Sequence, residues 1–285
     1  MMKFGIIGIA GYVAKKHLNC IKKMDGSLIA AYDKHDNVGF IDRDFPSANF
    51  FKKEQQFFSY IKKKKIDYLV ICSPTHMHFR HIIKGLASGA NVIVEKPPLL
   101  NSENLKKINI YEKKYNKKCY CIFQLRVNKK IINLKKKIDK EKNKKFEVKI
   151  FYNTFRGDWY FKSWKNDKKL SGGLAVNIGI HFFDILLWMF GSVKLFKLYR
   201  NTQNETKGIL NFEKANTQWL LSTKKLSKKS FKDNFIRYMK VNGKKINFDK
   251  FDDLHYENYQ KIIYDKKFHI SEFKNTIKFI DKLKK

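Results

Sequence analysis

The chain has 285 residues, 43% of them hydrophobic, and a formal net charge of +35 at pH 7. This length and apolar content predict one large or two medium globular domains and argue against a disordered chain. The positive excess is mostly lysine and is spread along the whole sequence, without an Arg-rich arm, zinc-ligand spacing or a stacking-strand motif. We therefore expect neither a nucleic-acid partner nor a dedicated polyanion-binding stripe.

The four cysteines, Cys20, Cys72, Cys119 and Cys121, lack the spacing of a metal site. Free thiols are typical of a reducing compartment. No apolar run approaches the roughly 18 residues of a membrane span, and glycines interrupt the apolar N-terminal stretch. We expect a cytoplasmic protein without a membrane partner.

The first half alternates short apolar runs with amphipathic segments, which is typical of βαβ units and a parallel sheet. A helix with Val13, Ala14, His17, Leu18 and Ile21 on its buried side is predicted between the first two strands. The expected strands are Lys3–Gly8, Ser27–Asp33, Ile66–Cys72, Asn91–Glu95 and Lys118–Phe123.

The turn after the first strand, Gly8-Ile9-Ala10-Gly11-Tyr12-Val13-Ala14, is a variant of the dinucleotide-binding fingerprint. It precedes a predicted helix N-terminus, where backbone N–H groups bind pyrophosphate. Asp33 ends the second strand, where a carboxylate accepts hydrogen bonds from the adenosine ribose and disfavours the extra phosphate of NADP. The pattern predicts NAD as the cofactor; a plain βα turn with a surface aspartate is the alternative.

Two further strand ends carry polar residues. Ser73-Pro74 follows the third predicted strand, and Glu95-Lys96-Pro97-Pro98 follows the fourth. The prolines stop the strand and direct Lys96 toward the ligand edge of the sheet, where a lysine serves as a hydrogen-bonding or acid–base group. His76, His78 and His81 have no fixed tetrahedral spacing and no carboxylate partner, so we expect no metal site.

The stretch Ser171–Phe190 has apolar residues at helical spacing. Asn177 and His181 are four residues apart, so a continuous helix would display both on one face. By itself His181 is best explained as a core histidine bonded to a backbone carbonyl; the motifs elsewhere favour a site residue instead. Asp184, farther along, either contributes to the site or only holds the helix.

The second half predicts strands separated by turn residues and two late helices. The strands are Phe146–Thr154, Lys194–Tyr199, Gly208–Phe212, Thr217–Ser222 and Phe235–Val241, and the helical patterns span Asp253–Tyr264 and Glu272–Leu283. The predicted fold class is α/β, with an N-terminal Rossmann domain at 1–121 followed by an α+β domain at 122–285. A lysine-rich run, Ser222–Phe231, has no catalytic assignment.

Together, the turn at Gly8, Glu95-Lys96-Pro97 and Gly172-Gly173…Asn177-x-Gly179-x-His181-x-x-Asp184 resemble the Gfo/Idh/MocA superfamily of nicotinamide-dependent sugar oxidoreductases. Gln124-Leu125-Arg126, Arg156-Gly157-Asp158-Trp159-Tyr160 and Ser163-Trp164-Lys165 make the chain more similar to its UDP-N-acetyl-2-amino-2-deoxyglucuronate 3-dehydrogenase branch. That branch usually has His-Pro after the Gln-Leu-Arg triplet, where this chain has Asn128-Lys129.

The resemblance implies an open, mostly antiparallel second sheet that covers the cofactor and forms a homo-oligomer, a dimer or tetramer. It implies NAD-dependent oxidation of a UDP-sugar at its C3 hydroxyl, in sugar biosynthesis for bacterial surface polysaccharide (O-antigen). The implied catalytic residues are Lys96 and His181, and which of them takes the proton stays open. The implied substrate contacts are Lys96, Arg126, Arg156, Tyr160, Asn177 and His181. The implied cofactor contacts are Gly8, Ala10, Gly11, Tyr12, Val13, Asp33, Ser73, Pro74, His78, Glu95, Lys96, Gln124, Trp164 and Lys165.

Two alternatives remain. The same fold could oxidise a free sugar or cyclitol, or the chain could bind NAD without catalysis.

Overall fold

The computed structural model describes residues 1–141, 143–226, 235–248 and 254–284. By its internal contacts the chain divides into two units: 1–123 with 255–277, and 124–254 with 278–285. The first boundary falls two residues after the one expected from the sequence. The segment 255–277, expected in the second domain, belongs to unit 1, so the division runs through the last helix.

Unit 1 contains a six-stranded sheet in the order β3-β2-β1-β4-β5-β6, with every pairing parallel. This is the strand order of the dinucleotide-binding Rossmann fold, and it confirms the predicted parallel sheet. The strands are β1 Lys3–Ile7, β2 Ser27–Tyr32, β3 Asn49–Phe51, β4 Tyr68–Ile71, β5 Asn91–Val94 and β6 Cys119–Cys121.

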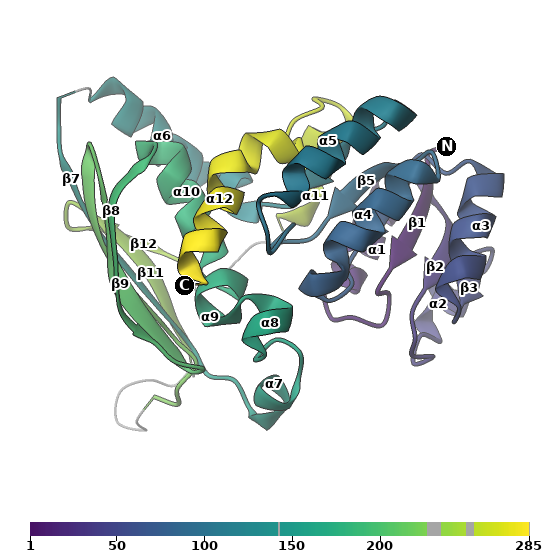
Figure 1. Ribbon diagram of the computed structural model, residues 1–285, viewed down its shortest axis with the longest axis horizontal. Helices are drawn as coiled ribbons and strands as arrows, with labels where there is room; N and C mark the ends of the chain where they lie inside the picture. The colour runs from purple at the N-terminus through teal and green to yellow at the C-terminus, as the bar shows by residue number, and fades with distance from the viewer. Residues whose placement is uncertain (142, 227–234, 249–253, 285) are drawn as a thin grey trace. The chain divides into compact units, whose positions relative to one another are not determined.

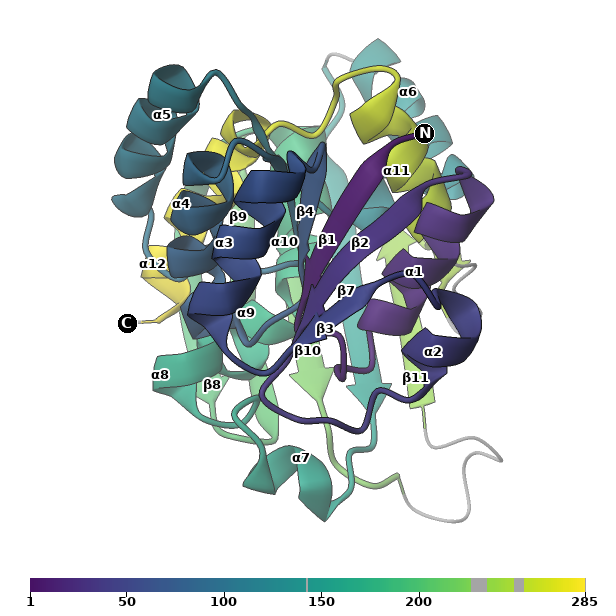
Figure 2. The same ribbon diagram turned by 90° about the vertical axis from the view of Figure 1, so that its right-hand side faces the viewer.

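Helices cover both faces of this sheet. Figure 2 shows α3, α4 and α5 on one face, and α1 beside α11 on the other. The helices are α1 Ala14–Lys23, α2 Phe40–Asp44, α3 Glu54–Lys64, α4 His78–Ala87, α5 Asn104–Tyr115 and α11 His255–Ile263, with short 3₁₀ turns η1 Thr75–Met77 and η3 Ile270–Phe273. On α1 the predicted buried residues are buried except Val13, which precedes the helix and is half-exposed.

Unit 2 contains a second six-stranded sheet in the order β12-β11-β7-β10-β9-β8. Only the β7–β10 pairing is parallel, which agrees with the predicted mostly antiparallel sheet. The strands are β7 Phe146–Thr154, β8 Val193–Asn201, β9 Glu205–Phe212, β10 Ala215–Ser222, β11 Phe235–Val241 and β12 Lys244–Asn247. Burial alternates along β7, β9 and β10, as expected when one face of a sheet is covered.

The covered face packs against α10, Ile180–Phe190 (Figure 1). Phe183 meets Trp219 of β10 with ring centroids 5.1 Å apart, and Phe182 meets Tyr152 of β7 at 5.8 Å. The other helical segments that reach this unit are η2 Gln124–Val127, α6 Lys129–Lys140, α7 Asp158–Lys162, α8 Lys168–Ser171, α9 Gly173–Asn177 and part of α12 Lys274–Leu283.

Asn128, where the branch usually has histidine, is the N-cap of α6. Its side chain accepts hydrogen bonds from the backbone N–H groups of Lys130 and Ile131. This N-cap contributes about 1 kcal/mol to helix stability, so the departure from the branch pattern has a structural role here.

Strands β3 and β12 were not expected from the sequence. Each has only three or four residues, too short for period-2 alternation to show. Of the lysine-rich run Ser222–Phe231, residues 227–231 lie outside the described residues, as does Asp253 at the start of a predicted helix.

No single described helix is long and apolar enough to cross a membrane. The segments Lys168–Asn177 and Ile180–Phe190 meet that length and composition only as a pair bent by 55°.

Candidate dinucleotide and substrate sites

The turn after β1 leaves no room for a side chain at Gly8. This residue has a φ of +81°, and a Cβ atom there would lie 2.6 Å from the carbonyl carbon of Cys72 and from the backbone nitrogen of Ser73. The turn is closed by a hydrogen bond from the N–H of Gly11 to the carbonyl of Gly8, 3.0 Å. Glycine at position 8 therefore lets the ends of β1 and β4 approach at the point where the strand order reverses, which is where open α/β sheets bind ligands.

Asp33 ties the end of β2 to this turn. One carboxylate oxygen accepts a hydrogen bond from the N–H of Ala10, 3.0 Å, and the other accepts from the N–H of His35, 3.0 Å. Asp33 is half-buried. A carboxylate has about four lone-pair positions, so these two bonds leave acceptor capacity for ribose hydroxyls.

The N-terminus of α1 suits an anion. Its N-cap, Val13, provides no side-chain hydrogen bond, and its first turn holds no acidic residue. Tyr12, just before it, is 85% exposed. A bare backbone turn leading into an uncapped helix N-terminus is the arrangement that binds pyrophosphate, so these residues fit NAD.

The loops after β4 and β5 are held together by buried histidines. Nδ1 of His78 lies 2.8 Å from the carbonyl oxygen of Pro97, and its Nε2 lies 2.8 Å from that of Ser73. The hydroxyl of Ser73 bonds Nδ1 of His81, 2.8 Å. Burial lowers the pKa of His78, and the two carbonyls oppose that effect because both favour the doubly protonated ring.

Glu95, at the end of β5, is 5% exposed. Its Oε1 lies 2.9 Å from Nε2 of His17 and 3.1 Å from Nε2 of His255, while its Oε2 accepts from the N–H of Lys96, 3.1 Å. Burial disfavours the charged form, but the hydrogen bonds from both histidines outweigh it and hold the pKa of Glu95 well below its usual value. The carboxylate is therefore ionised inside the unit.

Lys96 itself is half-buried and precedes a cis peptide bond to Pro97. His17, Glu95 and His255 each have one nitrogen or oxygen atom that could bind a metal ion, and these atoms lie within 4.8 Å of one another. Among the described residues they are the one group with such spacing. The three histidines considered from the sequence, His76, His78 and His81, do not form such a group with any described residues.

In unit 2, the predicted continuous helix over Ser171–Phe190 is wrong. Gly172 and Gly173 adopt φ of +82° and +78° at the start, and the helix breaks again between Asn177 and Ile180. At Gly179 an added Cβ would lie 2.6 Å from the ring of Phe183, so this glycine permits close packing at the second break. Asn177 and His181 therefore lie on two different helices, α9 and α10.

Several predicted ligand residues do come together in unit 2. Burial raises the pKa of Tyr160, and Arg156 and a hydrogen bond with Asn177 oppose that rise. Burial lowers the pKa of Lys165, and the nearby positive charge of Arg156 lowers it further. Lys165 also lies over the rings of Trp159, 5.0 Å, and Trp164, 5.7 Å. Nε of Arg156 is buried and has no hydrogen-bond partner among the described residues.

Arg126 has a different environment. Its Nε and Nη2 donate to the two carboxylate oxygens of Asp184 at 2.7 and 2.8 Å. Both side chains are largely buried, and the guanidinium lies 5.5 Å from the centre of the Trp188 ring. This bidentate pair ties η2 to α10 and gives Asp184 a helix-holding role.

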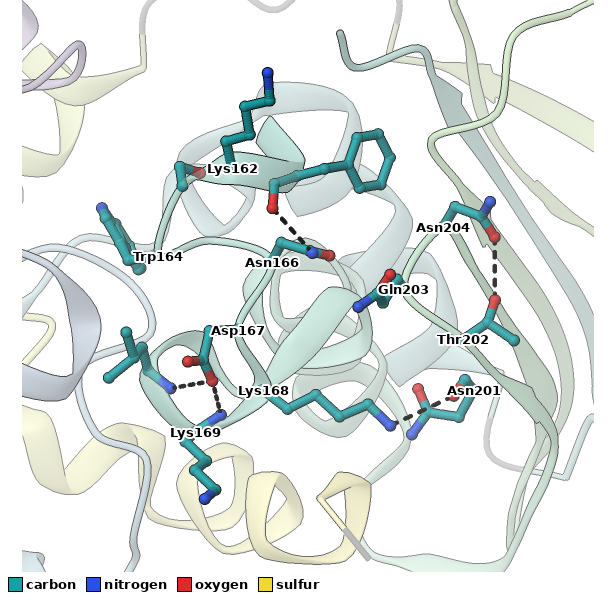
Figure 3. A pocket seen from close by; sticks show the side chains of 13 residues that line it. Lys162, Trp164, Asn166, Asp167, Lys168, Lys169, Asn201, Thr202, Gln203 and Asn204 are labelled. Carbon is teal, nitrogen blue, oxygen red and sulfur yellow. Dashed lines mark hydrogen bonds between the residues drawn. The ribbon is translucent and has the colours of Figure 1, made fainter. Parts of the chain in front are cut away.

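A cavity of about 1100 Å³ opens beside the loop that carries Trp164 (Figure 3). Its wall is rich in amides and lysines, including Asn166, Lys168 and Asn204, and Nζ of Lys168 bonds the carbonyl of Asn201, 3.4 Å. Trp164 is the one predicted site residue in its lining; Asn177, His181, Arg156 and Tyr160 lie outside it.

Three residues around Glu95 were not predicted as part of a site: His17, His255 and Tyr259. His17 was assigned only to the buried side of α1, which is correct, since it is fully buried. A histidine on an otherwise apolar helix face, with a buried acid after a parallel strand, is a signal for such a pair. His255 and Tyr259 lie about 160 residues beyond Glu95 and gave no such signal.

A parallel sheet with the Rossmann strand order, a glycine turn after its first strand and a separate mixed sheet define a dinucleotide-dependent oxidoreductase class. A model of the oxidoreductase family's NAD-binding Rossmann fold matches residues 2–123, and a model of the same family's C-terminal alpha/beta domain matches residues 135–265. The chain belongs to this family, Gfo/Idh/MocA. The predicted fold class and family are thus confirmed, as is NAD, the cofactor of the family's first domain.

Solved structures agree. The WlbA (WbpB) dehydrogenase from Thermus thermophilus, solved in complex with NAD and UDP-GlcNAcA, is 36% identical, with a TM-score of 0.95 over 100% of this chain and 95% of that one. The WlbA dehydrogenase of a Chromobacterium violaceum structure, at 16% identity and a TM-score of 0.82, covers 99% of this chain and 92% of that one and shows the same fold.

Curated relatives match over shorter segments. The putative oxidoreductase YteT of Bacillus subtilis is 27% identical over 48% of this chain and 33% of its own length. The scyllo-inositol 2-dehydrogenase (NAD(+)) of the same organism is 30% identical over 45% of this chain and 36% of its length. The matched segments thus span about a third of these relatives.

Proposed function

We propose that this chain catalyses the NAD-dependent oxidation of the C3 hydroxyl of a UDP-sugar, UDP-N-acetyl-2-amino-2-deoxyglucuronate, to the 3-keto sugar. The observation that carries the proposal is the 36% identity, over nearly the whole of both chains, to a dehydrogenase solved with NAD and UDP-GlcNAcA. The bound NAD would supply the hydride acceptor.

In this proposal the turn residues Gly8, Ala10, Gly11, Tyr12 and Val13 hold the pyrophosphate, and Asp33 holds the adenosine ribose. The absence of space at Gly8 and the uncapped N-terminus of α1 support this assignment. The remaining proposed cofactor contacts are Ser73, Pro74, His78, Glu95, Lys96, Gln124, Trp164 and Lys165. The carboxylate of Glu95 and the ring of His78 already bond other groups of the protein. These two residues would therefore act on the cofactor mainly by fixing the shape of the loops that contact it.

Lys96 and His181 are the proposed acid–base pair. One of them removes the C3 hydroxyl proton while the other donates a hydrogen bond to the oxygen on which charge develops. Which one is the base stays open. Asn177 is a neutral amide, so it would orient a sugar group without repelling an acidic substrate.

The charges in unit 2 favour an anionic substrate. Partial burial, and then the positive charge of Arg156, lower the pKa of the half-buried Lys165, which means that two positive groups lie close together where solvent screens them only in part. A uronate carboxylate or a pyrophosphate would relieve that repulsion and would give the buried Nε of Arg156 an acceptor. Tyr160 would join this contact. Arg126, which is paired with Asp184, is the remaining proposed substrate contact outside the acid–base pair and Asn177.

The proposal includes a cytoplasmic homo-oligomer, a dimer or tetramer, and a role in the synthesis of a surface-polysaccharide (O-antigen) sugar. The four cysteines are buried and none of them forms a disulfide, which is compatible with a reducing compartment.

The test is turnover. Purified protein is mixed with NAD and UDP-N-acetylglucosaminuronate, with a 2-oxo acid in parallel samples to recycle the cofactor, and the 3-keto sugar is identified by mass spectrometry. A panel of free sugars and cyclitols, including scyllo-inositol, runs beside it. Turnover of only the nucleotide-free substrates would replace the proposed substrate, and NAD binding by calorimetry without any turnover would reduce the chain to a cofactor-binding protein.

A further inference from the structure

Four buried residues of unit 1 form one hydrogen-bonded group, which we call the Glu95 cluster: His17, Glu95, His255 and Tyr259. They come from α1, the end of β5 and α11, and each is no more than 5% exposed. Nε2 of both histidines lies on Oε1 of Glu95, at 2.9 and 3.1 Å, and the hydroxyl of Tyr259 lies 2.8 Å from Nδ1 of His17.

The contacts fix which groups donate to Glu95. A carboxylate only accepts, so Nε2 of His17 and Nε2 of His255 both carry hydrogen and donate. Nδ1 of His17 accepts the hydrogen of the Tyr259 hydroxyl when the ring is neutral, and donates to that oxygen when the ring is doubly protonated. The cluster thus holds a buried anionic carboxylate with both its donors fixed in direction.

The fixed carboxylate has a consequence for the adjacent residue. With Oε1 bonded to the two histidines, Oε2 is aimed at the backbone N–H of Lys96, 3.1 Å away. On the other side of Lys96, the carbonyl of Pro97 lies 2.8 Å from Nδ1 of His78. The main chain that carries the Lys96 side chain is held from both directions by buried groups.

We propose that the Glu95 cluster is a positioning device for Lys96, and that His17 and His255 are positioning residues of the dehydrogenation reaction. The proposal rests on the proposed function, in which Lys96 acts on the substrate hydroxyl. Misplacement of a reacting group by about 1 Å costs on the order of 100-fold in rate. A buried charged cluster is a poor way to gain stability, because apolar residues of equal volume often stabilise as well or better.

The chain contains a matched control. His269 also anchors the C-terminal segment to a buried carboxylate, with its Nε2 2.8 Å from Oε1 of Glu112. The Glu112 carboxylate accepts a hydrogen bond from the backbone N–H of Cys119, 2.7 Å. The Glu95 carboxylate instead accepts one from the backbone N–H of Lys96. Breaking either pair removes one anchor of the C-terminal segment, but only the His255 pair reaches Lys96.

The experiment compares His255→Leu, His255→Gln and His269→Leu in the full chain. His255→Leu should lower kcat by roughly 10- to 100-fold while KM for the UDP-sugar and Kd for NAD change by less than about threefold. His255→Gln, whose amide can still donate to Oε1, should recover most of kcat. His269→Leu should lower the melting temperature and leave kcat within about twofold. Tyr259→Phe, which removes one hydroxyl, is a milder version in case His255→Leu does not fold.

A second measurement needs no substrate. Amide hydrogen exchange at Lys96, whose N–H donates to Oε2, should be faster in His255→Leu and Tyr259→Phe and unchanged in His269→Leu. If the variants exchange faster but the wild-type protein shows no turnover, the cluster does position Lys96 and the proposed function is wrong. Unchanged exchange at Lys96, equal losses of kcat in the leucine and glutamine variants, or a stoichiometric metal ion in the purified protein would each overturn the inference.

Discussion

The two groups of candidate residues are organised differently. Around Lys96, in unit 1, buried side chains bond one another and the main chain: Glu95 with two histidines, and His78 with the carbonyls of Ser73 and Pro97. In unit 2, glycines break the helical segment that carries Asn177 and His181, and the half-buried cations Arg156 and Lys165 lie close to each other.

This difference separates two ways of preparing a site. In the Lys96 region, Glu95 and His78 bond other groups of the protein, so folding sets their geometry. In the Arg156 region, the buried Nε of the arginine has no hydrogen-bond partner in the described part of the chain, and the pKa of Lys165 is lowered by burial and by that arginine. Its electrostatics are those of a site completed by an anion. We expect substitutions near Lys96 to affect the chemical step and substitutions near Arg156 to affect substrate affinity.

The largest effect should come from Lys96→Met, which shortens the unbranched side chain by one atom and removes its charge. Loss of an acid–base group costs about 10² to 10⁴ in rate, so we expect kcat to fall by about 1000-fold while NAD affinity falls far less, because Lys96 is one of many proposed cofactor contacts. Initial rates are followed by NADH absorbance and NAD affinity by calorimetry. Lys106→Met, an exposed lysine of α5, is the control. A variant at Lys96 with near-normal kcat would remove this residue from the chemistry.

Much of unit 1 could be predicted from sequence because its signals are local. Buried runs, the glycine turn and Asp33 lie within short segments, and the predicted strands agree with the observed ones to within two residues at each end. The predicted helix over Ser171–Phe190 was wrong because periodicity of apolar residues reports burial and not backbone continuity. The position of Gly179 against Phe183 depends on tertiary packing. The Glu95 cluster joins α1, β5 and α11, and no local pattern brings such distant residues together.

Gly8→Ala tests the turn that begins unit 1. The new Cβ would meet the backbone of Cys72 and Ser73 at 2.6 Å in addition to the strain of a φ of +81°. Since backbone strain alone costs about 1 to 3 kcal/mol and the clash adds to it, we expect a loss of about 3 kcal/mol in unfolding free energy and severely weakened NAD binding. Gly89→Ala has nearly the same φ, +85°, with nothing within 4 Å. It should lose about 1 kcal/mol and keep NAD affinity; equal losses in urea melts would show that the close approach to β4 is unimportant.

The pH dependence of unit 1 should include His81. Burial, the largest effect, lowers the pKa of its ring from 6.5 to about 4, although Glu54 opposes that shift. Between these values the unfolded chain binds a proton that the folded chain does not, so stability falls as pH falls through this window. We expect a loss of about 2 kcal/mol in unfolding free energy from about pH 7 to about pH 5. His81→Gln should be less stable at pH 7, since it disturbs the bond to Ser73, and its urea midpoint should change less with pH. An unaltered pH profile in the variant would assign the loss to other groups.

Arg156→Met tests whether the Arg156 region determines substrate affinity. Arginine–carboxylate and arginine–phosphate pairs contribute about 1.5 to 3 kcal/mol when one partner is buried. KM for the UDP-sugar should therefore rise by roughly tenfold, with kcat and NAD affinity nearly constant. Removing the arginine also removes one cause of the lowered pKa of Lys165, so that pKa should rise in the substrate-free protein. Arg200→Met, an exposed strand residue paired with Glu205, is the matched control and should leave KM unchanged. If Arg156→Met instead lowered kcat at constant KM, the arginine would act in the chemical step, and the division between a prearranged Lys96 region and an anion-completed Arg156 region would fail.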